Sequence, residues 1–295
     1  MKLYRTKKAR ERILSTYDQL LGQWGVPVTQ MDLPTRYGLT HVNACGDPKA
    51  PPLVLFHGVG DDSALMWIYN AAELAKHFRL YAIDTIGGPG KSVPSEGYGK
   101  GFSDALWIDA ILDGLKLDAV SMAGVSHGAY LTQAYLAARP ERVVKAACLA
   151  GGIPAGEGGS PMKTMMKIFL PEALFPTQNN IRKLLRKLAG KNSAAFTDHP
   201  LILAHFTALA RGYDNMAMRF HPVGNLPDAQ IRGYRDKVLY LIGEADPFAK
   251  LGGKAMLERY GMNARFFPEV GHGINHEIAG EINAILIEYF GADRR

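Results

Sequence analysis

The chain has 295 residues, of which 47% are hydrophobic, and its 34 basic and 28 acidic side chains give a formal net charge of +6. This apolar content is ordinary for a soluble protein, and the scattered charge, without an aromatic-interleaved basic patch or zinc-ligand spacing, argues against a nucleic-acid partner. No apolar run reaches the roughly 18 residues of a transmembrane helix, and no signal-type apolar stretch follows the basic residues 1–8, so we expect a cytoplasmic protein with no membrane partner.

An N-terminal helical segment, residues 1–27, is followed by a hairpin pattern and then by alternating strands and helices. That alternation predicts a mostly parallel sheet, and right-handed crossovers place helices on both of its faces. We expect strands at residues 28–33, 40–45, 53–56, 79–84, 119–123, 143–150, 238–242 and 264–267. We expect helices at residues 64–77, 103–115, 129–138, 253–260 and 274–289.

Between residues 152 and 228 the alternation stops, over a stretch too long for a plain loop in a compact domain. Within it, apolar residues recur at helical spacing opposite a basic face, namely Ile181, Leu184, Leu185 and Leu188. We therefore predict a helical cap insertion at residues 152–228 that covers one edge of the sheet. The core is then made of residues 28–151 and 229–295.

The pentapeptide Gly124-Val125-Ser126-His127-Gly128 lies between an apolar strand pattern and a helical pattern. In a strand-to-helix turn of this sharpness, side chains at the two flanking positions would clash, which explains both glycines. The serine hydroxyl of such a nucleophile elbow projects from the sheet, so we predict that Ser126 is a nucleophile. The alternative is a serine that only caps the following helix.

A carboxylate and a histidine follow in the chain order that serine hydrolases of this kind use. Asp246 comes directly after an apolar strand pattern, and His272 follows a shorter one. Because the carboxyl ends of parallel strands meet at one edge of a sheet, these loops converge on Ser126. We predict that His272 moves the proton and that Asp246 orients and stabilises the imidazole. Glu244 is the rival acid and His276 is the rival base, whereas Asp84, the carboxylate after another strand, is expected to have a structural role.

The strand at residues 52–56 ends in a glycine-rich turn, residues 57–60. Such a turn supplies a backbone amide, so we predict that the N–H groups of Val59 and His127 form an oxyanion hole near a helix N-terminus. The side chains of His57 and His127 are interpreted as hydrogen-bonded turn anchors rather than as catalysts.

Together these motifs resemble the α/β-hydrolase family, from Thr35 to the C-terminus. The motifs appear in family order: the His57-Gly58 turn, residues 84–92, the elbow at residues 124–128, Asp246, and Gly271-His272. Residues 17–27 with Trp24, the hairpin at residues 35–42 and residues 83–87 look like the bacterial carboxylesterase NP type. The resemblance implies a mostly parallel central sheet flanked by helices, a cap that roofs the active site, and chemistry that needs no metal and no organic cofactor.

We therefore expect a hydrolase of small-molecule carboxylic esters that works through an acyl-enzyme on Ser126. Lactone hydrolysis, hydrolysis of carbon–carbon bonds and acyl transfer use the same triad and stay open, as do a slow-turnover ligand sensor and the oligomeric state. The dehalogenase and epoxide-hydrolase branches are excluded because they carry aspartate where this chain has Ser126. A nucleotide-binding loop is excluded because Thr85 stands where its first glycine is required.

Overall fold

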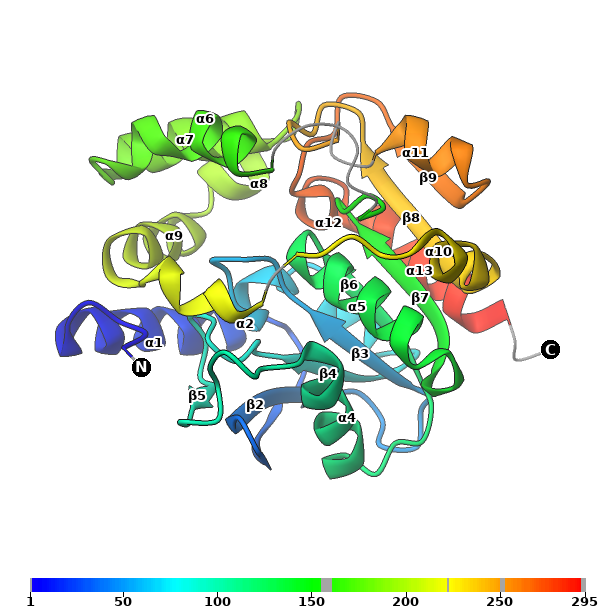
Figure 1. Ribbon diagram of the computed structural model, residues 1–295. Helices are drawn as coiled ribbons and strands as arrows, with labels where there is room; N and C mark the ends of the chain where they lie inside the picture. Colours follow the sequence, from blue (N-terminus) through cyan, green and yellow to red (C-terminus); the bar gives the residue numbers. More distant parts are fainter. Residues whose placement is uncertain (1, 155–160, 222, 250–252, 293–295) are drawn as a thin grey trace.

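The computed structural model describes residues 2–154, 161–221, 223–249 and 253–292, and a central sheet organises the chain (Figure 1). The strands are β1 (Thr29–Thr35), β2 (Gly38–Cys45), β3 (Pro52–Phe56), β4 (Arg79–Ile83), β5 (Val93–Pro94), β6 (Val120–Val125), β7 (Val143–Leu149), β8 (Val238–Gly243) and β9 (Asn263–Phe267). Their order is β1-β2-β4-β3-β6-β7-β8-β9, with β5 paired to β2. The pairs that involve β2 are antiparallel, whereas the pairs from β4 across to β9 are parallel. The predicted mostly parallel sheet is confirmed.

Both faces of the sheet are buried, which explains the continuous apolar patterns of its strands. Successive side chains of a strand point to opposite faces. In β3, Leu53 and Leu55 accordingly enter one hydrophobic core, while Val54 and Phe56 enter the other. Full burial of such a side chain stabilises the fold by about 1.5–3 kcal/mol, so these patterns fix which residue of each strand faces which core.

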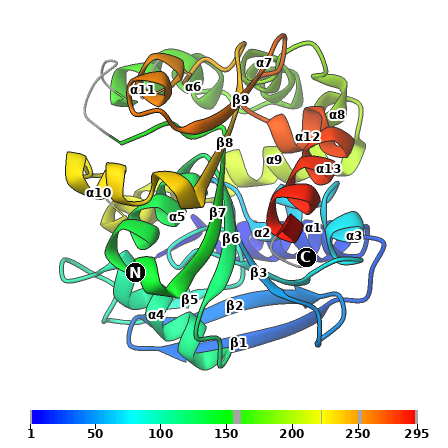
Figure 2. The same cartoon turned by 90° about the vertical axis from the view of Figure 1, so that its right-hand side faces the viewer.

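Helices cover both faces of the sheet, as Figure 2 shows from the side. One face carries α1 (Lys7–Leu21), α2 (Ser63–Met66), α3 (Ala71–Leu74), α12 (Ile274–Glu277) and α13 (Ala279–Gly291). The other face carries α4 (Asp104–Gly114), α5 (His127–Ala138), α10 (Asp228–Gly233) and α11 (Lys254–Arg259). Short 3-10 turns, η1 (Pro140–Arg142) and η3 (Arg235–Lys237), lead into β7 and β8. Right-handed crossovers between parallel strands produce this arrangement of layers.

The two long helices expected at residues 64–77 and 274–289 are each broken, into α2 and α3 and into α12 and α13. The side chain of Asn70, at the first break, donates to the backbone oxygen of Asn275 at 3.1 Å. Asn275 in turn donates to the backbone oxygen of Met66 at 2.6 Å. Buried amides thus bind carbonyl groups that helix ends leave without a partner, and they hold the two broken segments together.

The described part of the segment between β7 and β8 is largely helical, and residues 155–160 and 222 of the insertion predicted at residues 152–228 lie outside the described residues. It contains α6 (Pro161–Ala173), α7 (Gln178–Leu188), α8 (Ala194–Thr197), α9 (Pro200–Gly212) and the 3-10 helix η2 (Asn215–Phe220). Figures 1 and 2 show these helices grouped beyond one edge of the sheet. Ile181 and Leu185, from the apolar stripe of α7, are buried. In the described part of the chain, no helix has both the length and the apolar character to cross a bilayer.

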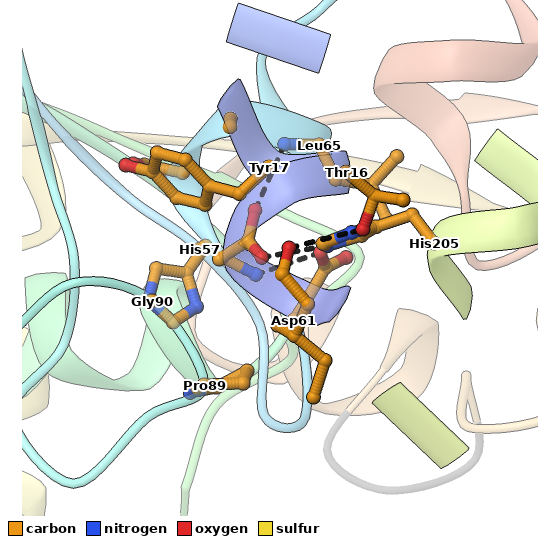
Figure 3. A network of polar contacts seen from close by, with 12 residues as sticks. Thr16, Tyr17, His57, Asp61, Leu65, Pro89, Gly90 and His205 are labelled. Atoms are coloured by element: carbon orange, nitrogen blue, oxygen red, sulfur yellow. Dashed lines mark hydrogen bonds and ion pairs between the residues drawn. The ribbon is translucent and has the colours of Figure 1, made fainter. Parts of the chain in front are cut away.

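Helix α9 is tied to the rest of the chain by a buried ion pair (Figure 3). His205 Nε2 lies 2.7 Å from Asp62 Oδ2, and His205 Nδ1 lies 2.7 Å from Thr16 Oγ1. The ring therefore bridges a carboxylate and a hydroxyl, and Thr16 Oγ1 also lies 3.1 Å and 3.0 Å from carbonyl oxygens of its own helix. Burial raises the pKa of Asp62, but the charge and hydrogen bond of His205 outweigh burial and lower it. The pair joins α9, α1 and the N-terminus of α2.

Removing one partner of this pair is expected to destabilise the protein strongly. Asp62→Asn removes the carboxylate that pairs with the fully buried side chain of His205, and breaking a buried pair costs about 3–5 kcal/mol of unfolding free energy. Urea unfolding at pH 7 measures the loss. As a control, Glu73→Gln breaks the exposed pair with Lys76, which is expected to cost less than about 1 kcal/mol. Equal losses of unfolding free energy in the two variants would contradict a stabilising role for the buried pair of Asp62 and His205.

Candidate active site

Ser126 lies in the turn between β6 and α5 with φ of 56° and ψ of −114°, and its side chain makes no capping hydrogen bond to the helix. A Cβ on Gly124 would collide with the carbonyl oxygen of Gly128, and a Cβ on Gly128 would collide with that of Phe56. Both glycines are therefore required by the backbone itself. The N–H of Ser126 donates to Leu149 O at 2.8 Å, which fixes the turn against β7.

Asp246 and His272 meet at the same edge of the sheet, beyond β8 and β9. His272 Nδ1 lies 2.8 Å from Asp246 Oδ2, so the ring donates from Nδ1 and leaves Nε2 free to act as a base. Burial lowers the pKa of His272, but the charge of Asp246 and its hydrogen bond, together with the charge of Glu277, outweigh burial and raise it. The carboxylate of Asp246 is itself held by the N–H of Phe248 at 2.8 Å.

The two rival residues lie elsewhere. Glu244 is exposed and its carboxylate lies 3.1 Å from Lys254 Nζ. His276 is buried, with Nε2 at 3.0 Å from the backbone oxygen of Leu65, and burial lowers its pKa to about 4. The structure therefore brings Asp246, and not Glu244, to His272, and it assigns His276 to the packing of α12.

The glycine-rich turn after β3 lies against the nucleophile turn, because a Cβ on Gly58 would stand 3.4 Å from Ser126 Cβ. His57 anchors this turn: its Nε2 accepts from the N–H of Thr85 at 2.9 Å, and its Nδ1 donates to Gly58 O at 2.8 Å. The amides of Val59 and His127 have no acceptor among the described residues. They are therefore available to a ligand.

The His127 side chain lies beside a histidine that sequence reasoning missed. His221 Nδ1 lies 2.6 Å from Asp104 Oδ1 and its Nε2 lies 2.7 Å from Ile86 O. Since both partners are acceptors, His221 is an imidazolium. Its ring centre lies 5.6 Å from that of His127. Burial, and then the charge of His221, lower the pKa of His127 to about 3, so this ring stays neutral next to the nucleophile.

Two carboxylates support the loops of the site. Asp84 accepts the N–H of Ser63 at 3.1 Å and that of Lys91 at 2.7 Å, which agrees with the structural role expected for it. Glu277 accepts the N–H of Gly271, next to His272, at 3.0 Å. Glu277 was missed, because a carboxylate just after a Gly-His-Gly loop carries no signal that separates it from an ordinary helical residue.

Comparisons with known proteins found similar sequences and similar structures. The model of the family described as alpha/beta hydrolase fold matches residues 51–277. The uncharacterized carboxylesterase nap of Bacillus subtilis (strain 168) is 30% identical over 294 residues, 96% of this chain and 93% of that protein. Carboxylesterase YbfK of the same organism is 37% identical over 139 residues, 47% of each chain. The crystal structure of naproxen esterase (carboxylesterase NP) from Bacillus subtilis has a TM-score of 0.80 at 27% identity, and the match covers 97% of this chain and 99% of that one.

The imidazole of His272 is expected to titrate above its ordinary pKa of about 6.5. Asp246→Asn removes the charge that stabilises the imidazolium, so it should lower this pKa, whereas Glu244→Gln should leave it unchanged. NMR of the imidazole protons and nitrogens across a pH titration measures all three proteins. A shift in the Glu244 variant but not in the Asp246 variant would reassign the partner of His272.

Proposed function

This chain belongs to the α/β-hydrolase family, and we propose that Ser126, His272 and Asp246 form the catalytic triad with which it hydrolyses carboxylic esters. The similarity of the chain to carboxylesterases supports a serine hydrolase of carboxylic esters, which is the function predicted from the sequence. The observation that carries the proposed triad is the 2.8 Å contact between His272 Nδ1 and Asp246, at the edge of the sheet where the strained turn presents Ser126.

The first half of the reaction transfers the acyl group to the enzyme. Ser126 Oγ attacks the carbonyl carbon of the ester while His272 Nε2 takes the hydroxyl proton, and the carbonyl oxygen becomes negatively charged. When the bond to the alcohol oxygen breaks, the imidazolium gives its proton to the departing oxygen. The alcohol leaves, and the acyl group stays on Ser126.

The second half releases the acid. Water attacks the acyl carbon and gives a proton to His272 Nε2, and the tetrahedral intermediate then expels Ser126 Oγ, which takes the proton back. Asp246 keeps the Nδ1–H tautomer in place and stabilises the imidazolium in both halves. The same stabilisation of the imidazolium raises the pKa of His272.

We propose that the backbone N–H groups of Val59 and His127 donate hydrogen bonds to the negative oxygen of each tetrahedral intermediate. Both amides lack a protein acceptor among the described residues, and that of His127 stands at the first turn of α5, where the helix dipole favours negative charge. Because both donors belong to the backbone, no single side-chain change removes them. The adjacent neutral ring of His127 adds no charge of its own.

We also propose that the insertion at residues 152–228 caps the site and shapes the substrate pocket. The ring of Phe169 on α6 lies 6.4 Å from that of Phe248, and Phe248 lies 4.9 Å from the ring of His272. An aromatic wall therefore runs from the cap to the catalytic imidazole, which suits a small ester with an apolar acyl or alcohol group. A cytoplasmic location and the absence of a nucleic-acid or membrane partner stay predictions from the sequence.

Initial rates on p-nitrophenyl esters of increasing acyl length test the proposal. Ser126→Ala is expected to lose turnover by a factor on the order of a million, because nucleophile and base act as one unit. Ser121→Ala, on the strand that leads into the same turn, is the matched control and should keep wild-type rates. A loss of only a few-fold in Ser126→Ala would contradict the triad.

Lactones, diketones and acyl acceptors in the same panel separate the alternative reactions of this triad. Ser126-dependent turnover of one of these substrates, with none on simple esters, would move the function to that reaction. Tight ligand binding without multiple turnover would instead favour the sensor.

The pH profile of kcat/KM is expected to have one acidic limb. Only the neutral imidazole accepts the proton of Ser126, so activity falls as pH drops through the pKa of His272. Since that pKa is raised, the limb should lie above pH 6.5. A limb near pH 4, where His276 titrates, would identify the other histidine as the base.

A further inference from the structure

The loop that carries His272, residues 268–273, is hydrogen-bonded to the backbone of the insertion. The N–H of His272 donates to Leu188 O at 2.7 Å, at the end of α7. In the opposite direction, the N–H of Lys191 donates to Glu269 O at 2.8 Å. We call residues 268–273 the histidine loop and residues 188–192 the cap segment. The two run side by side like a short pair of strands.

The backbones of the histidine loop and the cap segment are in direct contact. A Cβ on Gly190 would collide with the carbonyl oxygen of Glu269, and a Cβ on Gly271 would collide with that of Leu188. Both positions therefore require glycine for steric reasons. The position of the catalytic histidine is thus coupled directly to the position of the cap.

The carboxylate of Glu277 lies at this junction and binds both partners. Its Oε2 accepts the N–H of Gly190 at 2.8 Å, and its Oε1 accepts the N–H of Gly271 at 3.0 Å. The N–H of Gly273, on the other side of His272, helps to lower the pKa of this carboxyl. Glu277 therefore binds the amide that precedes His272 and one amide of the cap segment. Its own backbone oxygen accepts from the side chain of Asn192 at 3.1 Å.

We propose that Glu277 is a positioning residue for His272, which fixes the base against the nucleophile and couples it to the cap. This inference rests on the proposed triad. The ionised carboxylate suits the arrangement, because it offers an acceptor on each oxygen to amides that can only donate. The side chain is buried, with 7% of the residue exposed, so water does not compete for these amides.

The charge of Glu277 also acts on His272. Burial and the charge of Asp246 raise the pKa of Glu277, whereas the amides of Gly190, Gly271 and Gly273 lower it. The net effect is a raised pKa. The charges of Asp246 and Glu277 both raise the pKa of His272. The remaining charged groups of the junction, Lys191 and Glu269, lie 3.4 Å apart and pair with each other at the surface. Loss of the Glu277 charge should therefore lower the pKa of His272.

Glu277→Gln tests the proposal, because glutamine keeps the shape but turns one acceptor into a donor that faces an amide N–H. We expect kcat to fall by roughly 10- to 100-fold with little change in KM, and the acidic limb of the pH profile to move to lower pH. Glu269→Gln removes a carboxylate from the same loop that does not bind these amides, so its kinetics should match the wild type. A fall in Tm with unchanged kcat and limb would show a merely structural role and overturn the proposal.

Glu277→Asp is the second variant. It keeps the charge, so the pKa of His272 should stay close to the wild-type value, but its shorter side chain cannot reach the amides of both Gly190 and Gly271, and kcat should still fall. Wild-type kcat in this variant would contradict the positioning role.

NMR titration of His272 in the Gln and Asp variants gives a readout that needs no turnover. If the wild type shows no Ser126-dependent hydrolysis, the proposed function fails, and the titration still decides whether Glu277 acts on His272. An unchanged imidazole pKa in Glu277→Gln would overturn the electrostatic part of the proposal.

Discussion

The backbone of Ser126, at φ of 56° and ψ of −114°, occupies a conformation that residues with a Cβ rarely adopt. Such a conformation costs about 1–3 kcal/mol and persists only where the surroundings enforce it. Here the hydrogen bond from Ser126 N–H to Leu149 O and the close approach allowed by Gly124 and Gly128 enforce it together. Presentation of the hydroxyl therefore depends on an intact β6–β7 pair and on a helix that packs directly against β3.

The sheet order distributes the other groups around this turn. β3 lies on one side of β6 and brings the amide of Val59, whereas β8 and β9, beyond β7, bring Asp246 and His272. The insertion is tied to both sides. On the side of Val59, His205 of α9 pairs with Asp62, and on the side of His272, Glu277 binds the segment after α7. We infer that the cap and the catalytic loops are held as one unit.

Local patterns predicted the parts of the fold that local chemistry determines. The apolar runs placed β3 and β8 to within a residue, and the order of strand ends indicated which loops share one edge of the sheet. Contacts between distant segments were missed because no local pattern encodes them: His205 and Asp62 are 143 residues apart, and Glu277 and Gly190 are 87 apart. The break in the helix expected at residues 64–77 belongs to the same class, since a distant asparagine stabilises it.

The central claim is that Ser126 carries the acyl group during turnover, and mass spectrometry of the intact protein after reaction with a fluorophosphonate tests it most directly. This reagent phosphonylates an activated serine and mimics the tetrahedral intermediate. The account predicts one adduct per chain, located by peptide mapping on Ser126, and no adduct in Ser126→Ala or His272→Ala. An adduct on another residue, or an unmodified chain that still hydrolyses esters, would contradict it.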